Sequence, residues 1–417
     1  MSEMLKAGAG KAVIDLEGVL PFDGFDDVRH VLQCRALVVE GADTHVCILT
    51  VEMTSIASDL LALLTRVAME RTGCAVDGIW IVPTHTFSAP HVRTPAHLQN
   101  EDERSRNERY LSAVLDAAAE ACSMATDSLD EVVLGMSEGC CPVNIGRDIE
   151  TPAGWWVGVG GSGHADHAMP TLAFTRPDGS VVAVVATADL QSSVLDKSVD
   201  SDGRRLVSGD LFGFAAQKVE SELGCITLLM PGAAGDQSPR EKAVVESFNS
   251  HANRSVEDAH EVGYRMLHCQ GAELSRALLE SSRAAMGASN DAACDLARVD
   301  ARSFSVSLPA QERADFHSLA PRRAYEFKAA GEVETRVSLL HLGDVSLVGL
   351  QPEVASCFGT AVRAARPGRV LLATLVNGGA KYLPAPDAYQ KITYEAMNSG
   401  FAQGSHERLL KEILAAL

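Results

Sequence analysis

Side chains that can do chemistry follow several apolar runs of this chain. Six runs, HVCILTV, GIWIVPT, VVAVVATA, CITLLMPGAAG, VSLVGLQP and RVLLATLV, are followed directly or after a short turn by Glu52, His85, Asp189, Asp236, Glu353 and Tyr382, respectively. In open α/β sheets, ligands bind outside the carboxyl ends of the strands. These six side chains are therefore predicted to meet at one pocket. The plainer alternative is that polar residues gather at strand ends because strand ends meet water.

The residue types indicate a metal. A histidine, carboxylates and a phenol without a nearby cysteine cluster form a ligand set suited to zinc or another divalent cation. The turn MPGAAGDQSP places Gly235 before Asp236, Gln237 and Ser238, and its small residues would let the backbone approach a ligand closely. An ordinary strand-to-helix turn is the alternative. Ser238 lies in no GxSxG elbow, which favours a structural or substrate-contact role over a nucleophilic one.

Composition narrows the class of partner. The chain has 417 residues, 46% of them hydrophobic, and a formal charge of −19 without a basic cluster, which argues against nucleic acid and anionic membranes. No run approaches a membrane span, and the N-terminus does not resemble a secretory signal. The ten scattered cysteines form no CxxC pair, as in a reducing compartment. We expect a cytoplasmic protein with a small-molecule substrate, and homo-oligomerisation stays open.

The spacing of apolar residues predicts an α/β fold in which a mixed, mostly buried β-sheet is flanked by helices. Short unalternated Val/Ile/Leu runs are typical of strands buried on both faces. Amphipathic patterns predict helices at 58–73, 108–125 and 256–287, while LARVDARSFSVSLPA alternates as an edge strand does. The glycine-rich WWVGVGGSGHADHAMP is predicted to be a surface or active-site loop. We expect a single domain over 1–417, with a small subdomain at about 240–335.

Four motifs, in order, resemble those of the neutral/alkaline non-lysosomal ceramidases and their relatives. They are THTFSAP, MPGAAGDQSP, LQPE and the tail NGGAKYLPAPDAYQKITYEAMNSGFAQGSHE. The tail is the most specific, because Tyr382 and Tyr394 stand twelve residues apart, as the family's two active-site tyrosines do. The resemblance covers nearly the whole chain and implies the catalytic domain of that family, with its metal site at the C-terminal ends of strands.

The resemblance also implies one zinc ion per chain, held by two histidines, a glutamate and a tyrosine. His85, Glu353 and Tyr382 match three of these ligands, and Asp189 stands where the family has its second histidine. Because aspartate binds zinc at about 2.0–2.2 Å, Asp189 is expected to complete the site. The altered ligand leaves another divalent metal open.

A second departure concerns proton transfer. Phe87 stands where the family has a catalytic histidine. His91, His164 and His167 are the histidines that could replace it, and His91, Asp236 and Tyr394 are the first candidates for proton transfer. Arg147 matches a family arginine that faces the site, and with Tyr394 it is a candidate for stabilising the oxyanion. The residues expected to contact substrate are Phe87, Gly235, Gln237 and Ser238.

These expectations define a zinc-dependent amidohydrolase that cleaves the C–N bond of a small soluble N-acyl compound with activated water. The substrate is expected to differ from ceramide, because the sequence ends at Leu417 without the C-terminal β-sandwich domain of the ceramidases. Two alternatives remain. One is a lactone or ester hydrolase, or a lyase, on the same scaffold. The other is a non-catalytic binding protein that retains the pocket.

Overall fold

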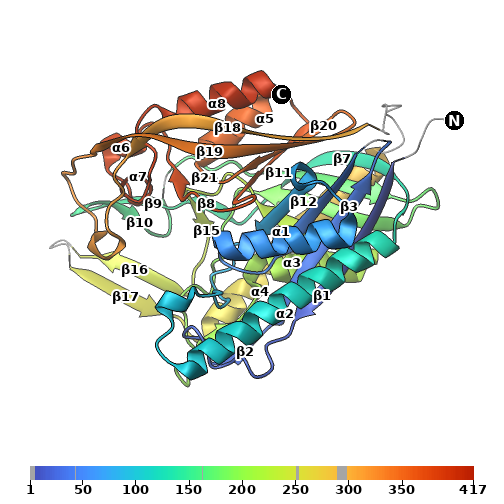
Figure 1. Cartoon of the computed structure of the whole chain (residues 1–417). Coiled ribbons are helices and arrows are strands. Elements are labelled where there is room, and N and C mark those ends of the chain that lie inside the picture. The colour runs from blue at the N-terminus through green and yellow to red at the C-terminus, as the bar shows by residue number, and fades with distance from the viewer. Residues whose placement is uncertain (1–4, 43, 162, 250–252, 289–297) are drawn as a thin grey trace.

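The computed structural model describes residues 5–42, 44–161, 163–249, 253–288 and 298–417. Within this part of the chain, three larger mixed β-sheets pack around a common apolar core, and helices cover the outer face of each sheet (Figure 1). The predicted class of fold, a mixed and mostly buried β-structure flanked by helices, is therefore confirmed, with several sheets where the sequence suggested one.

The first sheet has the strand order β5-β4-β3-β1-β6, and helices α1 and α2 pack against its outer face. Helix α1 ends at Gly73, whose φ of 71° closes the helix as the sequence predicts. Helix α2 starts earlier than predicted because Asn100 caps it by accepting a hydrogen bond from the Glu103 amide. The elements are β1 (Lys6–Ile14), β3 (Leu32–Glu40), β4 (His45–Val51), β5 (Ile79–Pro83), β6 (Asp130–Glu131), α1 (Ser58–Thr72) and α2 (Glu101–Asp127).

The second sheet has the order β14-β12-β11-β7, and helices α3 and α4 cover it. Its elements are β7 (Val133–Cys140), β11 (Ala168–Thr175), β12 (Val181–Ala188), β14 (Ile226–Pro231), α3 (Asp210–Leu223) and α4 (Glu261–Ala288). The third sheet has the order β18-β19-β20-β22, and helices α5 and α8 cover it. Its elements are β18 (Val299–Gln311), β19 (Ala329–Leu342), β20 (Val345–Leu350), β22 (Val370–Thr374), α5 (Ser356–Ala365) and α8 (Ser405–Ala416).

Each sheet contains one parallel pair of strands joined by a helix: β4 and β5 through α1, β12 and β14 through α3, and β20 and β22 through α5. The side chains of these strands alternate between the common core and the helices, so both faces are buried. This explains the unalternated apolar runs in the sequence. Because parallel strands run in one direction, the residues that follow each pair come together at one edge.

Short elements connect these layers. They are β2 (Asp27–Val28), β8 (Asn144–Gly146), β9 (Asp148–Thr151), β10 (Gly154–Val157), β13 (Leu206–Val207), β15 (Gln237–Pro239), β16 (Val244–Phe248), β17 (Arg254–Asp258), β21 (Glu353–Val354), β23 (Tyr382–Leu383), α6 (Ala388–Lys391), α7 (Tyr394–Met397) and the 3-10 turns Val76–Gly78, Pro95–His97 and Phe316–Ser318. The pair β21–β23 matters most for the site, because it is parallel and sets Glu353 beside Tyr382.

One predicted helix boundary is wrong. The pattern placed a helix from 256, but Arg254–Asp258 forms strand β17, which pairs with β16, and α4 begins at Glu261. The Asp258 carboxylate accepts hydrogen bonds from Ser198 and the Val199 amide, which holds this end of the hairpin against the body. The alternating run, whose first two letters lie outside the described residues, forms edge strand β18 as predicted.

The division into domains stays a prediction, and residues 250–252 and 289–297 of the expected subdomain lie outside the described part. Among the described residues, no helix combines the length and apolar character that crossing a membrane requires.

Candidate active site

His85 and Glu353 come together where two strands end. The His85 Nε2 atom lies 3.1 Å from Glu353 Oε2, and both side chains are 7% exposed. His85 Nδ1 lies 2.6 Å from the Thr54 carbonyl oxygen, so Nδ1 carries the proton that it donates to this oxygen, and in the neutral ring Nε2 presents a lone pair. Although close to the carboxylate, Nε2 lacks hydrogen-bond geometry to it and is a buried nitrogen without a hydrogen-bond partner. Such a nitrogen is suited to a metal ion.

Tyr382 completes this side of the site. Its backbone pairs with that of Glu353 in the parallel ladder β21–β23, so the two side chains leave neighbouring strands at the same level. Burial and the Glu353 carboxylate raise the pKa of the Tyr382 phenol well above its ordinary value, despite the opposing effect of Arg147. In contrast, the pKa of Glu353 is lowered: burial raises it, but the positive charges of a protonated His85, Arg147 and Lys381 outweigh that effect.

Arg147 and Gln191 link Glu353 to a second carboxylate. Gln191 Nε2 donates to Glu353 Oε2 at 3.1 Å, and Gln191 Oε1 accepts from Arg147 Nη1 at 2.7 Å. Arg147 Nε donates to Glu395 Oε1 at 2.7 Å, and its Nη2 lies 2.6 Å from the same oxygen. The guanidinium also lies 5.2 Å from the centre of the Tyr382 ring. Arg147 is thus a fixed positive charge between the two parts of the site.

Asp189 lies at the end of β12 as predicted, but an arginine engages its carboxylate. Arg363 Nη2 lies 2.7 Å from Asp189 Oδ2, and Oδ1 accepts from the Ala233 amide at 2.7 Å. Arg363, on helix α5, also bonds to Asp166 at 2.7 Å. The Asp189 side chain is 1% exposed and satisfied by these partners, so it is not free to bind an ion as it stands.

Two more carboxyl groups, Asp148 and Glu395, lie beside Arg147. Burial, then the neighbouring Glu395 and Asp236, raise the pKa of Asp148 well above its ordinary value, and the two carboxyl groups are close enough to share a proton. Asp236 Oδ1 accepts hydrogen bonds from Gln237 Nε2 at 2.9 Å and from the Ser356 amide at 2.8 Å. Burial nevertheless raises the pKa of Asp236 to about 6.

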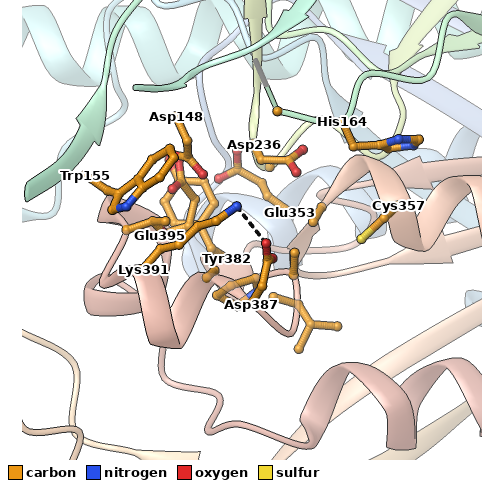
Figure 2. Close-up of a pocket in the computed structure, with 18 residues that line it drawn as sticks. Asp148, Trp155, His164, Asp236, Glu353, Cys357, Tyr382, Asp387, Lys391 and Glu395 are labelled. Carbon is orange, nitrogen blue, oxygen red and sulfur yellow. Dashed lines mark ion pairs between the residues drawn. The ribbon is translucent and has the colours of Figure 1, made fainter. Parts of the chain in front are cut away.

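Asp148, Asp236, Glu353, Tyr382 and Glu395 line a pocket of about 340 Å³, whereas His85 and Arg147 lie behind this lining, in contact with Glu353 and Glu395, respectively. Figure 2 shows Asp148, Asp236, Glu353, Tyr382 and Glu395 grouped in it, together with the ion pair of Lys391 and Asp387, which are 2.6 Å apart. Trp155 and His164, from the glycine-rich loop of the sequence, also line the pocket. The apolar part of the wall consists of Trp155, Ala355, Leu383, Pro384, Ala385 and Ala388.

The other predicted residues differ in whether they contact His85 and Tyr382. Phe87 packs edge-on against the His85 ring, with 4.7 Å between ring centres. Tyr394 stacks edge-on against Tyr382 at 5.8 Å, and burial raises the pKa of its phenol. His91 is bound instead to Asp23, 2.9 Å away and outside the residues that line this pocket.

The residues of the turn after β14 mainly hold neighbouring segments in place. Gly235 has no room for a side chain, since a Cβ there would lie 2.6 Å from the Glu353 carbonyl oxygen. Gln237 holds the His164 carbonyl oxygen at 2.8 Å, which anchors the loop, and Ser238 donates to the Pro239 carbonyl oxygen. Of these, Gly235 lines the pocket.

Sequence reasoning missed Gln191, Asp148 and Glu395. Gln191 stands two residues after Asp189, beyond the end of β12, where the chain bends and the Leu190 amide bonds back to the Ala188 carbonyl oxygen, so strand periodicity does not reveal its direction. Asp148 follows Arg147 directly, and Glu395 follows Tyr394. Nothing local marks these acids as pocket residues, because their environment depends on the packing of β9, which carries Asp148, against α7, which carries Glu395.

The residues present fit a metal ion in part. Two zinc ligands at about 2.0–2.1 Å in tetrahedral geometry lie about 3.3 Å apart, close to the His85–Glu353 separation of 3.1 Å. The fixed Nδ1 hydrogen bond is the usual outer partner of a metal-binding histidine. Asp189 does not fit, and the described residues include no group of three or more His, Cys, Asp or Glu placed to hold a metal. His85, Glu353 and Tyr382 would be the protein ligands, a set of three that leaves a position open.

The fold and the pocket at the strand ends define an α/β protein with a buried, carboxylate-rich site. No model of a known protein family matches the sequence, and no curated protein does. Among solved structures, neutral ceramidase from Pseudomonas aeruginosa is similar with a TM-score of 0.71 and 14% identity, over 99% of this chain and 73% of that chain. A ceramidase complexed with C2 gives a TM-score of 0.70 and 15% identity, over 99% of this chain and 74% of that chain. The chain therefore has a ceramidase-like fold, which confirms the resemblance seen in the motifs.

Proposed function

We propose that this chain is a metal-dependent hydrolase that cleaves the C–N bond of a small N-acyl compound. The observation that carries the proposal is the buried His85 Nε2, oriented by the Thr54 carbonyl and facing Glu353 Oε2 at 3.1 Å. With Tyr382 alongside, these residues would hold one divalent ion, with zinc the first candidate. Such an ion supplies a Lewis acid that polarises a carbonyl group and makes water more acidic.

The remaining residues are assigned to proton transfer and to stabilisation of the developing negative charge. Asp236 lines the pocket with a pKa of about 6, so near neutral pH it can accept the proton of the attacking water and return it to the leaving nitrogen. Water adds to the carbonyl carbon, the C–N bond breaks, and the products are a carboxylate and an amine. Tyr394, whose phenol keeps its proton, and Arg147 are the donors for the developing oxyanion.

The ceramidase-like fold supports hydrolysis of an amide, and the pocket supports a small substrate. A volume of about 340 Å³ lies at the lower end of the range for ligand sites. The acidic chain, with a charge of −19, favours a small molecule over nucleic acid. A cytoplasmic location and homo-oligomerisation stay predictions.

Metal analysis of the purified protein tests the proposal. We expect about one zinc per chain in the parent and loss of most of it in His85→Ala and Glu353→Gln. The exposed His317→Ala and Glu108→Gln serve as matched controls and should keep the metal. A parent that hydrolyses N-acyl amines undiminished after chelation and dialysis would contradict the proposal.

The Asp189–Arg363 ion pair favours a second candidate, a binding protein that keeps the pocket without turnover, because it leaves one ligand fewer than the family pattern implies. A screen of N-acyl amines with and without chelator separates the two. Mass spectrometry of the products separates hydrolysis, which adds the mass of water, from an elimination, which does not.

A further inference from the structure

We propose that the ligand of this pocket carries a cationic amino group, which Asp148 and Glu395 bind at a short, fixed separation from the His85–Glu353 site. The inference deepens the proposed function, on which its statement about substrates rests. It names the substrate class as a small amide whose acyl or amine part ends in an ammonium group.

The charge of the lining is the first support. Five of the 18 lining residues are Asp or Glu, against a single lysine. That lysine, Lys391, is already neutralised by Asp387 at 2.6 Å, and the nearby Arg147 is neutralised by Glu395. Because Asp387 and Glu395 are engaged in these two pairs, the excess of acidic groups in the lining consists of Asp148, Asp236 and Glu353. This excess favours a cation over a carboxylate or a phosphate.

Unpartnered oxygens are the second, independent support. Glu395 is 2% exposed, and neither its Oε2 atom nor the buried Oδ1 of Asp148 has a hydrogen-bond donor in the described part of the chain apart from a proton that the two carboxyl groups share. Both residues line the pocket. Leaving a buried acceptor unpaired is costly, whereas an ammonium group brings three donors and a compensating charge. A ligand ammonium would replace the proton that the two carboxyl groups share.

The separation between the ammonium site and the His85–Glu353 site limits the length of the ligand. Gln191 and the Arg147 guanidinium separate Glu353 from Glu395, so the ammonium site and the scissile bond are divided by the width of these two groups. Trp155, Leu383 and Pro384 supply an apolar wall for a short methylene chain. This arrangement suits an acylated diamine better than a long-chain lipid amide.

A charge series of probes tests this with the whole protein. Monoacetylated diaminobutane is the cationic probe, N-pentylacetamide its neutral analogue and acetamidobutanoate its anionic one, each titrated by calorimetry at one ionic strength. We expect the cationic probe to bind at least about tenfold more tightly than the other two. Asp148→Asn, which keeps the Arg147–Glu395 pair, should bring its affinity to within about threefold of the neutral probe. Asp59→Asn, an exposed aspartate on α1, is the matched control and should change nothing.

Binding of the probes tests the ammonium site, and their hydrolysis tests the proposed hydrolase. Equal or tighter binding of the neutral or anionic probe by the parent, no binding of the cationic probe, or an unchanged preference in a folded Asp148→Asn overturns the inference. If Asp148→Asn does not fold, the preference of the parent among the three probes decides. Selective binding of the cationic probe without hydrolysis supports the ammonium site but contradicts the hydrolase. Equal hydrolysis of the neutral and cationic amides supports the hydrolase but contradicts the ammonium site.

Discussion

The ion pair between Asp189 and Arg363 provides a sharp test of the site, because the sequence assigns Asp189 to a metal and the structure assigns it to an arginine. The two side chains are 1% and 7% exposed and lie 2.7 Å apart. Removing one partner of a buried pair costs about 3–5 kcal/mol. In Asp189→Asn, however, Arg363 keeps Asp166 at 2.7 Å, and the Asn oxygen can still accept from the Ala233 amide. We therefore expect Asp189→Asn to lower the free energy of unfolding by about 3 kcal/mol, the lower end of this range.

The assay is urea unfolding of the metal-free parent and variant, with metal content measured on the same preparations. The midpoint should fall with an unchanged slope, as for a loss of stability without a change in exposed surface. Zinc per chain should stay at the parental value, because His85, Glu353 and Tyr382 are unaltered. Asp166→Asn, which removes the more exposed partner of Arg363, should be milder, at about 1–2 kcal/mol.

The refuting result is specific. If Asp189→Asn lost its zinc while the metal-free protein unfolded at the parental urea concentration, Asp189 would be a ligand. Arg363 would then have to leave it when the ion binds, and the three-ligand site proposed here would be wrong.

Two further predictions depend on pKa values. Asp236→Asn should lower the hydrolysis rate by about 10²–10⁴-fold, because the ionised carboxylate accepts the proton of water. In a plot of kcat/KM against pH, the parent should gain activity through pH about 6 and the variant should not. A rise that persists in the variant would remove Asp236 from this role. Burial raises the pKa of Asp166, but hydrogen bonds from Arg363, the Ala168 amide and Thr360 outweigh it and lower the pKa from 3.8 to about 2. Because solvent screens this partly exposed carboxylate, its contribution to stability is about 1 kcal/mol, present above pH 4 and lost as pH falls towards 2. Urea midpoints of the parent should drop over that range more than those of Asp166→Asn.

Much of the fold follows from local patterns. Runs such as VVAVVATA are apolar throughout because alternate residues face a central core and an outer helix, so the strands could be predicted without knowing which sheet they join. The helix expected from 256 was misjudged because its first residues are polar and fit either a helix or a hairpin. The choice is made by pairing with Val244–Phe248, a partner that no local pattern reveals.

The site was predictable only where side chains leave strand ends. His85, Glu353 and Tyr382 follow apolar runs directly or after a turn, and the structure sets them close together. The partners of Asp189 and His91 were hidden because Arg363 lies on a helix far along the chain and Asp23 lies in an early loop. Which of several acids meets a base depends on tertiary packing.

Backbone strain gives an independent reason to place function at this edge. His85 has a φ of 60°, and Leu375, Asn377 and Lys381, between β22 and Tyr382, have φ values of 60°, 54° and 59°. Residues other than glycine adopt this left-handed region at a cost, and it persists where the surrounding structure requires it. Here the reversal at His85 aims the imidazole at Glu353, and the residues before Tyr382 return the chain to pair with Glu353. A turn selected for stability alone would place glycine at such positions. Other non-glycine residues with positive φ in the described part of the chain, such as Asp23 and Asp210, lie elsewhere, and none of them flanks Asp189 or Glu353, so the strain bears on how His85 and Tyr382 are placed. It supports these two of the three ligands and gives Asp189 no such support.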